Sequence, residues 1–131
     1  MTGSVAPDEL LARDIIYSKW IRSSDQAVKQ DAFIPPDSEL SVTRHLGLTE
    51  EAIWIIGGKI AESIPRPLHG RADVKTSHVI AQRLNVVPQP EDDNPNHANI
   101  TNWPPDKDAR KICALEIARA AHFVANPEGK V

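Results

Sequence analysis

The residues best suited to chemistry gather in one short segment, residues 94–99, which reads Asn-Pro-Asn-His-Ala-Asn. If residues 98–101 form a strand, His97 and Asn99 lie on the same face of it, because side chains alternate along a strand. An imidazole there could transfer a proton, and an amide could orient a phosphate or carbonyl oxygen. The alternative is structural, since Asn-rich turns bond their own backbone, and His97 would then bond backbone as well.

Three further residues could complete an anion site with His97. Arg44 and His45 lie at the end of a predicted strand over residues 40–44, and Arg71 lies in a polar stretch before the next predicted helix. Guanidinium and imidazole groups together suit a phosphate or a carboxylate. The alternative for this group is a set of solvated turns.

Glu116 is a candidate of a different kind. At about 100° per residue it falls between Ile112 and Ala120, inside the apolar stripe of the last predicted helix. A carboxylate in that position must be paired, or its pKa rises. It is either an ion pair with a structural partner such as Arg119 or a carboxylate at the floor of a pocket.

No cofactor and no metal are predicted. The sequence has no glycine-rich phosphate loop and no His-Glu-x-x-His helix, and no two histidines lie four residues apart. Cys113 is the single cysteine, which excludes an internal disulfide, and its place on an apolar helix face predicts an inert buried thiol.

Charge and hydropathy argue against nucleic acid and membrane as partners. The formal net charge is −3 and the pI is about 5.9, whereas phosphates and anionic lipids attract basic faces. A helix-turn-helix around Gly47 is conceivable, but its second helix would offer only Lys59 to DNA. The N-terminus has no basic segment followed by an apolar one, and no apolar run approaches roughly 20 residues, so we expect a cytoplasmic protein.

A helix over residues 50–63 is expected to position part of this chemistry. Thr49 is its predicted N-cap, and glutamates fill the first turn, where they complement the helix dipole. Its inward stripe carries mainly isoleucines together with Gly57. Trp54 and Ile55 then point away from the stripe, so either a loop covers them or they form a surface for a partner.

The remaining patterns predict a small α+β domain. Extended segments are expected at 13–22, 31–34, 40–44, 84–87 and 98–101, with a hairpin-like pair between the second and the third. A short helix is expected at 77–83, and a long one begins after Asp106 and continues past Val124. This order predicts one domain over 1–131, a small mixed or antiparallel sheet with two to three helices packed on one face, and flexible ends at 1–8 and 126–131.

Two segments, DAFIPPDSELSV (Asp31–Val42) and NPNHANI (Asn94–Ile100), resemble a pattern of small uncharacterised bacterial proteins. The resemblance implies a bacterial source and no particular activity.

Three functions therefore remain open. The first is a cytosolic binding or accessory protein that joins a protein partner or a second copy of itself through Trp54 and Ile55. The second is a small enzyme or ligand-binding domain for a phosphate-bearing or acyl compound, with His97 as general acid/base, Asn99 orienting, and Arg44 or Arg71 holding the anion. The third is a DNA-binding regulator.

Overall fold

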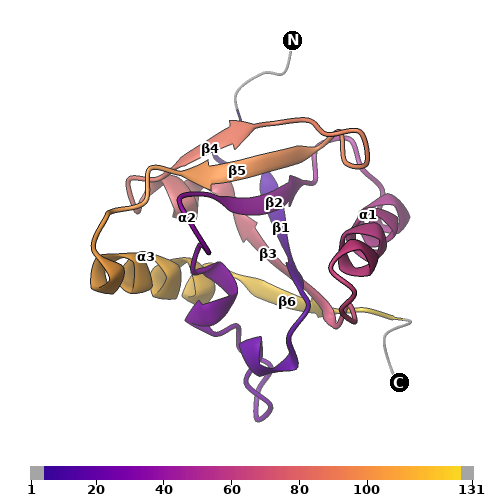
Figure 1. Cartoon of the computed structure of the whole chain (residues 1–131), viewed down its shortest axis with the longest axis horizontal. Coiled ribbons are helices and arrows are strands. Elements are labelled where there is room, and N and C mark those ends of the chain that lie inside the picture. Colours follow the sequence, from indigo (N-terminus) through magenta and orange to yellow (C-terminus); the bar gives the residue numbers. More distant parts are fainter. Residues whose placement is uncertain (1–4, 128–131) are drawn as a thin grey trace.

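The computed structural model describes residues 5–127 and shows an antiparallel sheet with helices on both faces (Figure 1). The strands are β1 (Leu10–Ile15), β2 (Leu40–Arg44), β3 (Gly70–Lys75), β4 (Asn85–Pro88), β5 (His97–Thr101) and β6 (His122–Ala125). Their order across the sheet is β4-β5-β2-β1-β3-β6, and every neighbouring pair is antiparallel. The two central strands, β2 and β1, are therefore the first two in the sequence, and later strands flank them on both sides.

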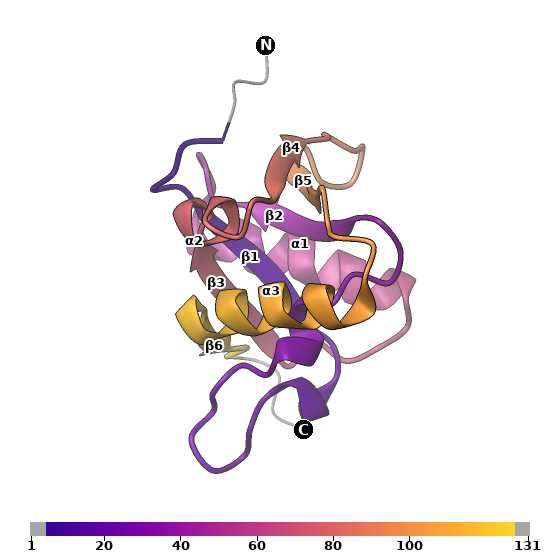
Figure 2. The ribbon, with the colours of Figure 1, turned by 90° about the vertical axis from the view of Figure 1, so that its left-hand side faces the viewer.

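The two faces of the sheet differ in character. Alternation places Leu11 and Ile15 on one face, and these side chains are fully buried in the hydrophobic core. The core lies under α3 (Lys107–Ala120), α2 (Thr76–Ile80) and the 3-10 helix η2 (Gln30–Phe33). A second 3-10 helix, η1 (Ser18–Trp20), borders the core near η2. The opposite face carries more polar side chains and is partly covered by α1 (Glu50–Ser63), which lies behind the sheet when α3 is in front (Figure 2).

Helix α1 has the predicted bounds and the predicted cap. The Thr49 hydroxyl oxygen accepts a hydrogen bond from the backbone N–H of Ala52, which satisfies one of the free donors of the first turn. Ile53, Ile56 and Gly57 are buried toward the sheet. The apolar stripe therefore predicted the inward face correctly for these residues, whereas Ile64, the last isoleucine of the stripe, is 44% exposed.

Helix α3 begins where predicted but ends earlier. The Asp106 carboxylate accepts from the N–H of Ala109, and the helix stops at Ala120 because Ala121 has an extended backbone. Phe123 and Val124, which we expected within the helix, lie in β6 and pair with β3. The prediction was wrong there because an apolar pair fits a helix face and an edge strand equally well.

The polar stretch before α2 is an interior strand, β3, which lies between β1 and the edge strand β6. All six residues of β1 pair with β3, from Leu10 opposite Lys75 to Ile15 opposite Gly70. A side chain at Gly70 would collide with the Val124 carbonyl oxygen and the Phe123 ring, so the close approach of β6 requires glycine here.

The expected hairpin of residues 31–34 with 40–44 was also wrong. Residues 30–33 form η2, and β2 pairs instead with β1 and β5.

The predicted α+β class with an antiparallel sheet is confirmed. Helices α2 and α3 pack together on one face, while α1 lies across the other. Of the predicted flexible ends, 1–4 and 128–131 lie outside the described residues; within the structure Val5 is buried and Asn126 donates its backbone N–H to His69. Among residues 5–127, no helix has both the length and the apolar character needed to cross a bilayer.

Candidate functional site

Strands β1 and β2 separate soon after they meet. Only two register pairs join them, Leu11 with Arg44 and Ala12 with Thr43, whereas six join β1 to β3. The Arg13 guanidinium bridges the gap: Nε donates to the carbonyl oxygen of Ala32 at 2.9 Å and Nη1 to that of Ser41 at 3.1 Å. Burial lowers the pKa of Arg13 to about 10, so it still carries its charge at neutral pH.

A narrow cleft opens at this separation, between the polar face of the sheet and the second half of α1. The sheet contributes Asp14, Thr43 and His97 to its lining, and α1 contributes Ile60 and Ile64. One wall is therefore apolar, and the sheet supplies hydrogen-bonding groups. Its volume is about 50 Å³, well below the roughly 300–1,000 Å³ of sites for drug-sized molecules, so it can take only a few atoms of a ligand.

Asp14 is the most unusual group in the cleft. Its carboxylate forms no hydrogen bond and no ion pair with any residue from 5 to 127. Burial raises the pKa of Asp14 to about 6. The nearby positive charges of Arg13 and Arg71 oppose this shift only in part, and the negative charge of Asp73 adds to it. A carboxyl group in this state changes its charge close to neutral pH.

The backbone of α1 approaches Asp14 closely at Gly57. A methyl group on Gly57 would stand 2.9 Å from Asp14 Oδ1 and 3.2 Å from Leu68 Cδ2. At Gly58, the next residue, a methyl group would meet nothing within 4 Å. Gly57 therefore makes room for the carboxylate under the helix.

His97 lies on the same face of the sheet, opposite Thr43 in β2. Its Nδ1 is 2.9 Å from the carbonyl oxygen of Gln89 and 3.7 Å from Glu91 Oε2. A carbonyl oxygen can only accept, so Nδ1 carries the proton of this hydrogen bond. Gln89 follows the edge strand β4, and His97 is also one of the residues that line the cleft.

The Asp14 carboxylate and His97 Nε2 are both accessible from outside the protein. In the part of the chain that the structure describes, Arg71 Nη1 is the single side-chain nitrogen or oxygen that is both buried and without a hydrogen-bond partner. Neither the Asp14 carboxylate nor His97 Nε2 has a partner among these residues, so both reach open space.

Two predicted catalytic residues do not join His97 in the cleft. Asn99 shares the face of His97, as expected for alternating residues, but its amide donates to Gln89 Oε1 and Glu39 Oε1. Arg44 is opposite Leu11 and so on the core side, where it forms a buried bidentate pair with Glu9 at 2.6 and 2.9 Å. The prediction that His97, Asn99 and Arg44 form one anion site was therefore wrong, because Asn99 and Arg44 are bonded to other residues.

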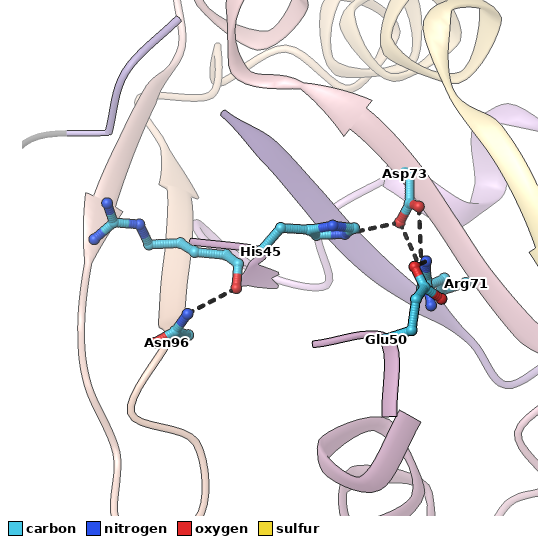
Figure 3. A network of polar contacts seen from close by, with 6 residues as sticks. His45, Glu50, Arg71, Asp73 and Asn96 are labelled. Atoms are coloured by element: carbon cyan, nitrogen blue, oxygen red, sulfur yellow. Dashed lines mark hydrogen bonds and ion pairs between the residues drawn. The ribbon is translucent and has the colours of Figure 1, made fainter. Parts of the chain in front are cut away.

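Arg71 and His45 belong to a polar network beside the cleft (Figure 3). Arg71 is 2% exposed; its Nε donates to Asp73 Oδ1 at 3.0 Å, and its Nη2 donates to Glu50 Oε1 at 2.7 Å. His45 Nε2 lies 3.0 Å from the same Asp73 oxygen. The Trp54 ring stacks over the guanidinium, with its centroid 4.7 Å from Arg71 Cζ.

The charges of this network attach helix α1 to strand β3. Burial raises the pKa of Asp73, but hydrogen bonds from His45 and Arg71 outweigh it, and the pKa ends below its usual range. The hydrogen bond from Arg71 likewise lowers the pKa of Glu50. Both carboxylates are therefore ionised at neutral pH and hold the first turn of α1 against β3, which leaves Arg71 largely occupied.

Glu116 does not lie at a pocket floor. Its side chain is 42% exposed and pairs with Arg119 at 3.1 Å, the structural alternative considered above. The buried face of α3 is made by Ala114, Ile117 and Ala118, so the predicted inward stripe was rotated, and Ile112 is largely exposed.

Trp54 and Ile55 lie on an open, shallow groove on the outer side of α1. Ile55 is 53% exposed, while Trp54 is half-buried against Arg71. Lys59 and Glu62 also line the groove, so its charge is mixed. No described loop covers Ile55.

Sequence reasoning missed Asp14. The available signal was the pair Arg13-Asp14 inside the apolar run Leu-Leu-Ala-Arg-Asp-Ile-Ile, because charges within a buried strand require an explanation. Its neighbours in space come from β3 and α1, which one sequence cannot bring together.

Among residues 5–127, no group of three or more His, Cys, Asp or Glu side chains is arranged to hold a metal ion. Comparisons of the chain with models of protein families, with curated proteins and with solved structures found no match.

Proposed function

We propose that the protein is a small ligand-binding domain whose cleft, between α1 and the separated strands β1 and β2, takes a compact molecule. The observation that carries the proposal is the Asp14 carboxyl group, which is largely buried in this cleft and has no partner among the described residues. Water reaches this carboxyl group only in part, so a ligand that hydrogen-bonds it would replace solvation that the fold removes.

The cleft supports an acyl or other weakly polar ligand better than a phosphate. Phosphate recognition needs free guanidinium or ammonium groups. Arg44 is bonded to Glu9, and Arg71 is bonded to Glu50 and Asp73 and is only 2% exposed, so neither presents an accessible guanidinium group. The apolar wall of Ile60 and Ile64 suits a hydrocarbon portion instead.

The test is a fragment screen by NMR with a cleft-filling variant. Fragments should shift the backbone amides of Asp14, Thr43 and His97, and Ser41→Phe, which fills the cleft, should abolish these shifts. Ser38→Phe, in the exposed loop before β2, is the matched control and should leave them unchanged. Shifts that persist in Ser41→Phe, or a screen without any shift in the cleft, would reject the proposal.

A second candidate function is assembly with another protein, and the exposure of Ile55 favours it. Single exposed apolar residues are common, but Ile55 stands on a groove beside an aromatic ring and charged residues, as in the centre of many interfaces.

The test compares two aspartate variants as bait in source-cell extract. Ile55→Asp should lose a partner that wild type and Ile112→Asp both retain, since Ile112 is equally exposed on α3, across the sheet. A partner retained by all three baits, or by none, rules out this surface. Sedimentation of the pure protein separates a second copy of the chain from a foreign partner.

A further inference from the structure

Strand β6 is one of the two edges of the sheet, and some of its backbone groups point away from the sheet (Figure 1). The backbone N–H of Asn126 donates to the carbonyl oxygen of His69, just before β3. Hydrogen-bonded and non-hydrogen-bonded pairs alternate along an antiparallel ladder, so Val124, two residues earlier, also bonds β3. The N–H and C=O groups of Phe123 and Ala125 therefore point outward.

No residue from 5 to 127 satisfies these outward groups. Within this range, no hydrogen bond from another element reaches the main chain of Phe123 or Ala125, and β3 is the only strand beside β6. Strand β6 also has no proline and no Lys, Arg, Asp or Glu, the residues that commonly keep edge strands from pairing. It thus presents two donors and two acceptors for another strand.

The opposite edge of the sheet, β4, differs in this respect. The backbone N–H of Gln89 donates to the carbonyl oxygen of His97, so by the same alternation Val86 and Pro88 are the residues of β4 that point outward. Proline has no N–H, so Pro88 removes one of the two outward donors of this edge. Only β6 retains both donors and both acceptors.

We propose that β6 pairs with β6 of a second copy of the chain, in antiparallel orientation, so that two sheets become one. A two-fold axis beside Val124 places Phe123 of each copy opposite Ala125 of the other. Each of these two residue pairs exchanges two N–H···O bonds, so every outward donor and acceptor of both edges is satisfied.

The side chains of β6 favour a second copy over an unrelated strand. In this register the large Phe123 faces the small Ala125, and Val124 faces its own counterpart. Side chains directly opposite one another lie about 5 Å apart, so opposed like charges would destabilise the pair, and β6 carries none. Phe123 and Val124 are half-buried in the single chain, and pairing buries more of their apolar surface.

Amide hydrogen exchange, measured by NMR, tests this pairing. In a dilute sample the Phe123 and Ala125 amides should exchange quickly, because they face solvent. Where sedimentation equilibrium shows about 90% of the chains paired, their exchange should slow by about tenfold, because it then takes place from the free chains. The Val124 amide, which bonds β3 in both states, is the internal control.

Two variants at Ala125 assign the contact to this edge. Ala125→Pro gives β6 the protection that Pro88 gives β4, and Ala125→Lys places a charge on the edge while keeping the N–H. Both should leave the protein monomeric, with the Val124 amide still protected. Val87→Lys is the matched control on β4, where the Val87 side chain is 45% exposed, and it should associate as wild type does.

Three results would overturn the inference. The first is a wild-type protein that stays monomeric up to about 1 mM, even if a foreign protein then protects the Phe123 and Ala125 amides. The second is a dimer that both Ala125 variants retain. The third is a dimer that Ile55→Asp loses and Ala125→Lys keeps, which would assign the contact to the outer side of α1.

Discussion

The carboxylate of Asp14 lies directly beneath Gly57, so close that a methyl group on the glycine would stand 2.9 Å from Asp14 Oδ1. A glycine inside a helix costs about 1 kcal/mol relative to alanine. Glycine is nevertheless present at position 57, where any larger side chain would contact the unpaired Asp14 carboxyl group too closely.

The first prediction compares the two adjacent glycines of α1. Gly58→Ala should raise the free energy of unfolding by about 0.5–1 kcal/mol, because its methyl group enters open space. Gly57→Ala should give no such gain and should lower stability by about 1 kcal/mol, because the methyl group overpacks Asp14 and Leu68. Urea unfolding measures both.

A double-mutant cycle identifies the cause. In an Asp14→Ala background the main obstacle is gone, so Gly57→Ala should become neutral or stabilising. If Gly57→Ala destabilises both backgrounds equally, the carboxylate is not the reason for the glycine.

The second prediction concerns pH. Asp14 has a pKa of about 6 in the fold and about 3.9 in the unfolded chain, so between these values the native state holds a proton that the unfolded state has released. Stability from this group therefore falls as pH rises from about 4 to about 6, by at most about 3 kcal/mol, and stays level above.

The measurement is the difference in unfolding free energy between wild type and Asp14→Asn at several pH values. Asparagine does not titrate, so the variant should gain on wild type as pH rises through this window. Asp73 and Glu50, whose pKa values are lowered, oppose this trend in both proteins and largely cancel in the difference. A flat difference would show that the pKa of Asp14 is ordinary.

The third prediction separates the two carboxylates that hold Arg71. Asp73→Asn should cost about 2–4 kcal/mol, because it leaves the 2%-exposed guanidinium without its buried counter-charge. Glu50→Gln should cost under about 1 kcal/mol, because the Glu50 side chain is 68% exposed and its pair is screened by water. Similar losses for both would mean that the outer pair is as important as the inner one.

The fourth prediction tests the attachment of β6. Gly70→Ala should detach this strand, because the new methyl group cannot coexist with the Val124 carbonyl oxygen. Hydrogen exchange should accelerate at the β6 amides while those of β5, at the other side of the sheet, stay protected. Unchanged exchange in β6 would contradict the assigned register.

The elements that the sequence predicted well are those with local signals. Thr49 and Asp106 cap α1 and α3, and each helix begins where its cap indicates. Strand β3 was missed because its charged residues look like a solvated linker. Arg71 and Asp73 are compatible with an interior strand because they form an ion pair with each other. That ion pair depends on side-chain contacts, which the pattern of apolar and polar residues along the sequence does not reveal.

The candidate site was predicted in part. The segment around His97 was identified and its strand face was predicted correctly, whereas Arg44 and Glu116 were assigned roles that their partners Glu9 and Arg119 now explain. Asp14 was missed because its state arises from burial under α1, a property of the assembled fold.

The short pairing of β1 with β2 has a mechanical consequence. The sheet consists of two three-stranded halves, β4-β5-β2 and β1-β3-β6. Only two register pairs and the Arg13 side chain join these halves. Fewer backbone pairs cross this junction than join β1 to β3, so we expect it to be the part of the sheet that resists bending least. The cleft lies beside this junction, so bending there would change the width of the cleft, and a molecule bound in it would oppose that bending.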